Sequence, residues 1–131
     1  KTLKKGKGGS IINIGSIYGI VSPDQKIYNK GRKIENQKNV LYTITKSSLV
    51  GLTKHLSVIF AKDKIRVNCT CFGGVKNKQN KNFIKKYSEN TPMKRLAKKS
   101  EFNGLINFLI SDASSYITGS NIVVDGGLTS V

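Results

Sequence analysis

The stretch 10–16, which reads SIINIGS, is short, apolar and rich in β-branched side chains. These properties are typical of a strand that is buried on both faces of a parallel sheet. Gly15 and Gly19 stand at its carboxyl end, where the backbone must turn. Two later stretches, 65–70 (IRVNCT) and 122–124 (IVV), have the same apolar character. The sequence therefore predicts three short strands.

Helical periodicity separates these strands. Across 40–61 the apolar side chains recur every three or four residues, which indicates an amphipathic helix. They are Leu49, Leu52, Leu56, Ile59 and Phe60. We expect a shorter, exposed helix over 80–89, and a further helix that Ser100 caps and that ends near residue 111. The polar stretch 21–39 predicts a long loop between the first strand and the long helix.

This alternation of strands and helices predicts an α/β fold with a parallel sheet and right-handed crossovers. In open parallel sheets, ligands bind beyond the carboxyl ends of the strands. We therefore expect a binding site among the stretches 16–19, 72–77 and 126–128, which follow the three predicted strands.

The net charge of the chain suggests a second class of function, the binding of a polyanion. The 131 residues include 23 basic and 7 acidic side chains, which gives a formal net charge of +16. Such a charge suits a nucleic acid or another polyanion. Only three of the basic residues are arginines, however, and base recognition favours the planar arginine fork. We interpret the lysines as a solvated surface, and a polyanion-binding module is the alternative.

Other features of the composition bear on membrane insertion, cellular compartment and metal binding. No stretch approaches the roughly 20 apolar residues that a membrane-spanning helix needs, so we expect no membrane partner. Cys69 and Cys71 are the only cysteines, and two cysteines cannot build a disulfide framework. A reducing cytoplasm fits this cysteine usage best. No histidine, cysteine or carboxylate set has the spacing of a metal site, so we expect no metal.

Tyr42 and Lys46 stand four residues apart on the long helix, so they share one face. A phenol has a pKa of about 10, and a nearby ammonium lowers such a pKa because it favours the phenolate. A tyrosine in that setting serves as a general acid or base. Ser16, at the end of the first strand, could hold a carbonyl or alcohol oxygen. The spacing alone also fits a packed tyrosine beside a surface lysine.

Four stretches, taken together, match one known pattern. They are 10–19 (SIINIGSIYG), 42–54 (YTITKSSLVGLTK), 65–74 (IRVNCTCFGG) and 111–127 (SDASSYITGSNIVVDGG). In this order they resemble the serine-bearing strand, the helix with the active-site tyrosine and lysine, the segment that leads into the nicotinamide loop, and the carboxyl-terminal signature of the short-chain dehydrogenase/reductase family. The matches keep the order of the family and span nearly the whole chain.

The resemblance implies an NAD- or NADP-dependent oxidoreductase that transfers a hydride between the nicotinamide and a carbonyl or alcohol carbon of a small molecule. Tyr42 would be the catalytic acid or base, Lys46 would favour its phenolate and bind the nicotinamide ribose, and Ser16 would hold the substrate oxygen. Backbone groups of Gly73, Gly74 and Val75 would meet the nicotinamide carboxamide. Family members commonly form homo-oligomers through the helix that carries the tyrosine and the helix before the serine strand.

Two departures from the family pattern concern the site. The usual proline of the nicotinamide loop is Phe72 here, which leaves the loop geometry open. The interval between Ser16 and Tyr42 is longer than usual, as in members that act in bacterial surface-sugar and flagellin-glycan pathways. The longer loop would suit a bulky polar substrate such as a nucleotide sugar, and a surface elaboration explains it equally well. Tyr18 either lines the pocket or merely packs.

A third departure concerns the cofactor phosphates. No G-x-x-x-G-x-G or G-x-G-x-x-G pattern is present, so the turn that holds dinucleotide phosphates at a helix N-terminus is not found. We therefore expect 1–131 to form the carboxyl-terminal half of a Rossmann-like, doubly wound parallel sheet. Such a chain alone would be inactive, because it lacks the phosphate-binding half. It would also be marginally stable, because its sheet would expose an unpaired edge. A non-catalytic truncated fragment is the alternative.

Overall fold

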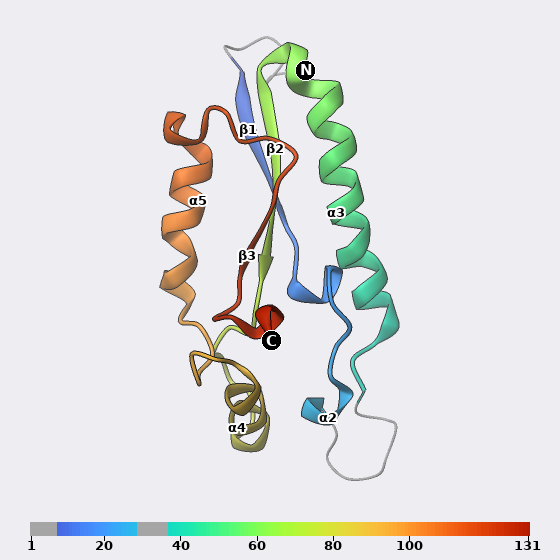
Figure 1. Cartoon of the computed structure of the whole chain (residues 1–131), viewed down its shortest axis with the longest axis vertical. Coiled ribbons are helices and arrows are strands. Elements are labelled where there is room, and N and C mark those ends of the chain that lie inside the picture. The colour runs from blue at the N-terminus through green and yellow to red at the C-terminus, as the bar shows by residue number, and fades with distance from the viewer. Residues whose placement is uncertain (1–7, 29–36) are drawn as a thin grey trace.

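Three parallel strands form the sheet of the computed structural model, which describes residues 8–28 and 37–131. Strand β1 spans Gly9–Ile14, β2 spans Ile65–Phe72 and β3 spans Asn121–Val124, in the spatial order β1-β2-β3. Gly9 pairs with Ile65 and Cys69 pairs with Asn121, so β2 has a neighbour on each edge. Because the strands are parallel, their carboxyl ends lie toward the same end of the sheet (Figure 1).

Helices flank this sheet on two sides. Helix α3 (Val40–Phe60) runs along one side and α5 (Asn103–Ile110) along the other, while α2 (Gln25–Tyr28) and α4 (Lys81–Asn90) lie beyond the carboxyl ends of the strands (Figure 1). Asn39 and Asn80 cap α3 and α4, because their side-chain oxygens accept backbone N–H groups of the first turns. Short 3₁₀ turns complete the fold at Ile17–Gly19, Ala61–Asp63, Lys99–Phe102, Asp112–Ser114 and Leu128–Ser130.

The predicted α/β architecture is confirmed, but two local predictions are wrong. The stretch 21–39 is not loop throughout, because α2 forms within it; residues 29–36 of that stretch lie outside the described residues. Ser100 does not cap a helix, since it lies inside a 3₁₀ turn and α5 begins only at Asn103. The Glu101 carboxylate accounts for this turn, because it accepts the backbone N–H of Lys98 and pairs with Arg95.

Strand β2 is the buried centre of the molecule. The side chains of Val67, Cys69 and Cys71 have no exposed surface, and neither does the polar side chain of Asn68. Asn68 is satisfied on both sides: its Nδ2 donates to the carbonyl of Ile117 at 2.8 Å, and its Oδ1 accepts the N–H of Ser120 at 3.1 Å. These two bonds fasten β2 to the turn that leads into β3, as a fully buried amide requires.

Helix α3 meets the sheet through small polar residues. Thr53 and Ser57 are its buried side chains, and the Thr53 hydroxyl accepts a 2.8 Å hydrogen bond from Asn13 of β1. The apolar stripe that predicts the helix is real, but part of it faces away from the described core, since Leu52 and Ile59 are exposed. Small side chains let α3 lie close to the strands, and this close packing turns the larger apolar residues outward.

Candidate active site

Ser16 lies immediately beyond β1, at the start of the turn Ile17–Gly19. Its backbone is extended, with φ −158°, and only 5% of the residue is exposed. The Ser16 hydroxyl oxygen accepts the backbone N–H of Tyr18 at 3.2 Å. Because a hydroxyl can donate and accept at once, Ser16 keeps its own O–H to donate to an oxygen beside it.

Lys46 connects α3 to the end of β1. Its Nζ donates to the backbone carbonyl of Ile14 at 2.8 Å, and it lies 5.8 Å from the centroid of the Tyr42 ring. Gly19 lets the turn after β1 lie close to the backbone of α3, because a Cβ at that position would lie 2.6 Å from the Lys46 carbonyl oxygen. The turn after β1 therefore packs directly against α3, close to the predicted tyrosine–lysine pair (Figure 1).

One cavity of about 370 Å³ brings the predicted site residues together. Ser16 comes from the turn after β1, Tyr42 and Lys46 come from α3, and the loop after β2 supplies the third wall. All six residues named from the sequence line it: Ser16, Tyr42, Lys46, Gly73, Gly74 and Val75. The third predicted stretch, 126–128, does not line this cavity. Its Gly126 lines a separate hollow of about 210 Å³.

The loop after β2 keeps an ordered path although Phe72 stands where the family has proline. Phe72 is the last residue of β2, and its ring packs on that of Phe102 with the centroids 4.2 Å apart. The next residue, Gly73, donates its N–H to the carbonyl of Val124 at 2.9 Å. Strand pairing and an aromatic contact therefore direct the chain into the cavity wall without the fixed φ of proline.

Tyr87 of α4 supports the same loop from behind. Its hydroxyl accepts the N–H of Gly74 at 2.5 Å, and a Cβ on Gly74 would lie 2.6 Å from the Tyr87 ring. Burial raises the pKa of Tyr87 to about 12, although the Gly74 hydrogen bond acts in the opposite direction. Tyr87 therefore stays protonated at neutral pH and serves as a neutral support for the backbone.

Two further tyrosines form an aromatic wall. Tyr18 packs edge-to-face on Tyr42, with centroids 6.5 Å apart, and Tyr28 donates its hydroxyl proton to the Tyr18 hydroxyl at 2.9 Å. Burial raises the pKa of Tyr18 above its ordinary value. Both alternatives for Tyr18 hold, since it lines the cavity and is almost fully buried.

Sequence reasoning missed Tyr28 and Lys38 of this cavity. Tyr28 lies in α2, within the stretch read as loop, and Lys38 directly precedes the α3 cap. Neither belongs to a periodic pattern, so the order of residues gives no signal for their approach to Tyr42. Only the folded path of the chain between β1 and α3 brings them there.

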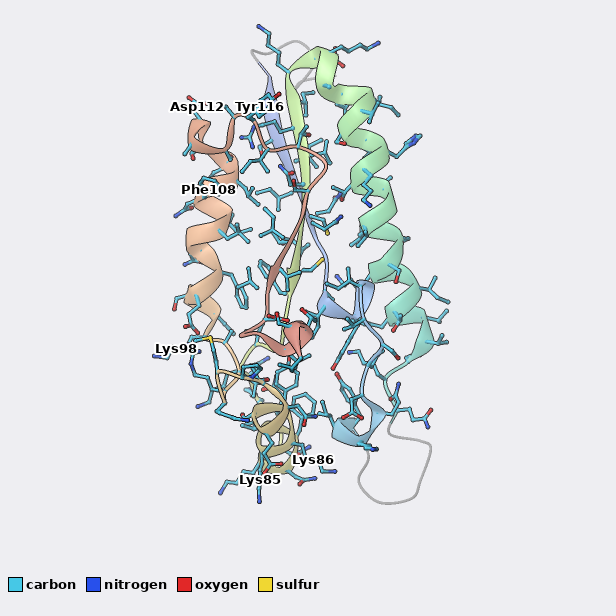
Figure 2. The ribbon with its side chains drawn as sticks, viewed as in Figure 1. Lys85, Lys86, Lys98, Phe108, Asp112 and Tyr116 are labelled. Atoms are coloured by element: carbon cyan, nitrogen blue, oxygen red, sulfur yellow. The ribbon has the colours of Figure 1, made fainter. Side chains whose placement is uncertain are left out.

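The lysines between residues 76 and 99 are exposed, apart from the half-buried Lys86. Lys85 and Lys98 are exposed, and Figure 2 shows them at the outer side of α4 and of the turn that follows it. Among the described residues, no group of three or more histidine, cysteine or acidic side chains could hold a metal ion. Within the same residues, no helix is long and apolar enough to cross a membrane.

Comparison with known proteins identifies the chain. A family model described as enoyl-(acyl carrier protein) reductase matches residues 1–129. A short-chain dehydrogenase from Leptospira borgpetersenii, solved with bound NAD⁺, is 40% identical and superposes with a TM-score of 0.83 over 92% of this chain and 44% of that one. The chain belongs to the short-chain dehydrogenase/reductase family. The resemblance inferred from the four sequence stretches is thereby confirmed.

This short-chain dehydrogenase/reductase is also similar to two dehydrogenases whose names include a sugar-derived compound. The D-arabinitol 2-dehydrogenase of Candida tropicalis is 38% identical over 127 residues, which are 91% of this chain and 41% of that protein. A gluconate 5-dehydrogenase from Burkholderia cenocepacia, in complex with NADP and tartrate, is 26% identical with a TM-score of 0.85, covering 99% of this chain and 48% of that one. The chain therefore spans less than half the length of each of these three relatives.

Proposed function

We propose that this chain contributes the catalytic half of an NAD- or NADP-dependent oxidoreductase that transfers a hydride between a nicotinamide and a carbonyl or alcohol carbon. One observation carries the proposal: two separate segments, the turn after β1 and helix α3, place Ser16, Tyr42 and Lys46 on the wall of one cavity. The relatives support the same activity, because they include proteins named as dehydrogenases and structures with NAD⁺ or NADP bound.

Each of the three side chains has a role that its surroundings permit. Ser16 donates its O–H to the substrate oxygen, since its bond with the Tyr18 N–H uses the hydroxyl only as an acceptor. Tyr42 gives its phenolic proton to that oxygen as the carbonyl becomes an alcohol, and it takes the proton back in the reverse direction. Lys46 lies beside Tyr42 and is held in place by the Ile14 carbonyl.

The cavity fits one end of the proposed cofactor. A nicotinamide would supply or accept the hydride, and the backbone of Gly73, Gly74 and Val75 would face its carboxamide. The glycines suit this role because the loop backbone lines the cavity in close contact with Tyr87, where a Cβ on Gly74 would lie 2.6 Å from the Tyr87 ring. No glycine-rich phosphate turn is found in the 131 residues. We propose that protein outside this partial domain holds the phosphates.

The same reasoning extends to the state of the isolated chain. Among the described residues β1 pairs only with β2, so its other edge has no strand partner there. An unpaired edge is prone to association. We propose that the 131 residues alone are inactive and marginally stable. Tight NADH or NADPH binding by these residues alone, measured by titration, would contradict this part of the proposal.

Substrate, assembly and compartment are also proposals. The sugar-derived compounds in the names of two relatives support a polar sugar derivative as substrate. The exposed apolar residues of α3 support assembly into a homo-oligomer. Cys69 and Cys71 are free and buried, and burial raises the pKa of Cys71 to about 11, with Cys69 adding to it. Thiols kept in this form suit a reducing cytoplasm.

Replacement of the Tyr42 hydroxyl tests the proposed function. In the protein that carries this chain, Tyr42→Phe should lower kcat/KM for carbonyl reduction by about 10²- to 10⁴-fold, because proton transfer is lost. The measurement is NADH or NADPH oxidation with a panel of ketones and keto-sugars. Tyr116→Phe is the matched control, since Tyr116 is fully exposed at the other end of the molecule (Figure 2). Equal turnover by Tyr42→Phe and the control would overturn the proposal.

A further inference from the structure

Lys38 brings a second ammonium group into the candidate active site. It lies immediately before Asn39, the cap of α3, and its backbone N–H donates to Gln25 of α2 at 2.8 Å. This bond ties Lys38 to α2, while the next residue of the chain caps α3. The Lys38 Nζ then lies 3.8 Å from the centroid of the Tyr42 ring and 5.8 Å from that of the Tyr28 ring.

The charge of the cavity wall is one-sided. Among the described residues that line it, Lys38 and Lys46 are charged and none is an aspartate or glutamate. Asp24 lines a different hollow. Its two carboxylate oxygens accept hydrogen bonds from the backbone N–H of Lys26 and from the side-chain amide of Asn90. The cavity therefore holds two positive charges without a compensating carboxylate in the part of the chain that the structure describes.

The two ammonium groups differ in the groups that they contact. Lys46 Nζ already donates to the Ile14 carbonyl, so part of its capacity is used in holding α3 to β1. Lys38 Nζ meets the faces of two aromatic rings, which attract a cation but are weaker acceptors than an ionised oxygen. A carboxylate or phosphate in the cavity would gain a charge-assisted hydrogen bond from Lys38 while the rings keep the ammonium in position.

We propose that Lys38 is a specificity-determining residue, and that the substrate carries an anionic group, a carboxylate or a phosphate, close to its reacting carbon. This inference rests on the proposed function, because it takes the cavity as the substrate site. The position beside the Tyr42 ring puts the anion next to the proton donor. A cationic substrate is disfavoured, since the space between the Tyr28 and Tyr42 rings already holds an ammonium group.

Binding of small anions and their neutral counterparts tests the inference without turnover. The protein that carries the chain is titrated with succinate and with succinamide, and with glycerol 3-phosphate and glycerol, and the affinities are measured by calorimetry or ligand-observed NMR. We expect at least one anion to bind about tenfold more tightly than its neutral counterpart, as one strong charge-assisted hydrogen bond allows. The pair that shows the preference tells a carboxylate substrate from a phosphate.

Variants assign the preference to Lys38. Lys38→Gln should lose the preference for the anion, whereas Lys38→Arg should retain it because the charge remains. Lys54→Gln is the matched control, since it removes one positive charge from an exposed position of α3 that does not line the cavity. Equal affinity for both anions and their neutral counterparts in the unsubstituted protein would overturn the inference, and so would an unchanged preference in Lys38→Gln.

The outcome is separate from that of the proposed function. Anion binding that depends on Lys38 supports the inference even where no hydride transfer is detected. Turnover that depends on Tyr42 but shows no preference for anionic substrates, with Lys38→Gln kinetics unchanged, overturns the inference and leaves the proposed function in place.

Discussion

Strands β1 and β2 are both short and apolar and they pair with each other, but they differ in what covers them. β2 is paired on both edges, and Val67, Cys69 and Cys71 have no exposed surface. In β1, which is paired on one edge among the described residues, half of the Ile14 residue is exposed. A strand this apolar is expected to be buried. The contrast marks β1 as the side on which the fold and the site are open.

The position of the site follows the same contrast. Ile14 and Ser16, at the open end of β1, line the cavity together with the loop that leaves the buried strand β2. The buried strand fixes one wall through its pairing with β3, and the open strand presents the serine. The predictions below test how different these two strands are, beginning with the largest expected effect.

Removal of the buried amide of β2 should cost the most. Asn68→Ala deletes the bonds to Ile117 and Ser120 and removes the partner of two backbone groups in half-buried residues. We expect a loss of about 3 kcal/mol in the free energy of unfolding, measured with urea. The matched variant Asn13→Ala, in β1, removes one bond to Thr53 and should cost about 1 kcal/mol. Equal losses for the two variants would break the contrast between the strands.

Hydrogen exchange should show the open edge residue by residue. Gly9 and Gly15 donate their N–H groups to carbonyls of the β2 side, at Lys64 and Thr70. Because N–H directions alternate along a strand, the amide of Ile11 also faces β2, whereas that of Ile12 faces the open edge. We expect the Ile12 amide to exchange about tenfold faster than that of Ile11, as the loss of about one hydrogen bond implies.

Neighbouring amides of β2 provide the control for this measurement. Asn68 and Cys69 both lie in a strand with two partners, so their amides should be protected to a similar degree. Equal protection of Ile11 and Ile12 would contradict an open edge in the protein that is measured, and would show that further protein covers β1.

The smallest effect concerns the turn before α5. The hydrogen bonds from Arg95 hold the pKa of Glu101 at about 2, below its ordinary value of 4.5, and the Lys98 N–H acts in the same direction. The folded state therefore favours the carboxylate. The resulting stabilisation is complete above the ordinary pKa and is lost as the pH falls from about 4.5 toward 2.

A comparison of two proteins measures this effect. The unsubstituted protein should lose more stability between pH 5 and pH 3 than Glu101→Gln, in urea unfolding at each pH. The difference should be small and should shrink in high salt, because exposed ion pairs are screened. An NMR titration in which Arg95→Gln leaves the Glu101 pKa at about 2 would contradict the assignment of the shift to Arg95.

Much of the fold follows from local patterns in the sequence. The apolar runs predict all three strands, and the helical spacing of Tyr42 and Lys46 predicts their shared face, because both depend on the periodicity of one element. Ser16 is found through the rule that ligands meet strand ends. The six predicted residues line one cavity for this reason.

The features that the sequence does not predict depend on contacts between distant segments. The inner face of α3 is formed by Thr53 and Ser57. Their small side chains allow close packing on the strands, and they are not part of the apolar pattern. Lys38 reaches the Tyr42 ring because Gln25 holds its backbone. Ser100 has the residue type of a helix cap, but the Glu101 carboxylate fixes a tighter turn at that point.

The most direct test of the account is to locate the nicotinamide in the protein that carries this chain. Reduced nicotinamide mononucleotide, which lacks the adenylate half, is titrated while backbone amide shifts are recorded by NMR. The account predicts that the shifts change at Gly73, Gly74 and Val75 and not at Gly119 or Ser120, before the amino end of β3. Shift changes that avoid the loop after β2 would contradict it.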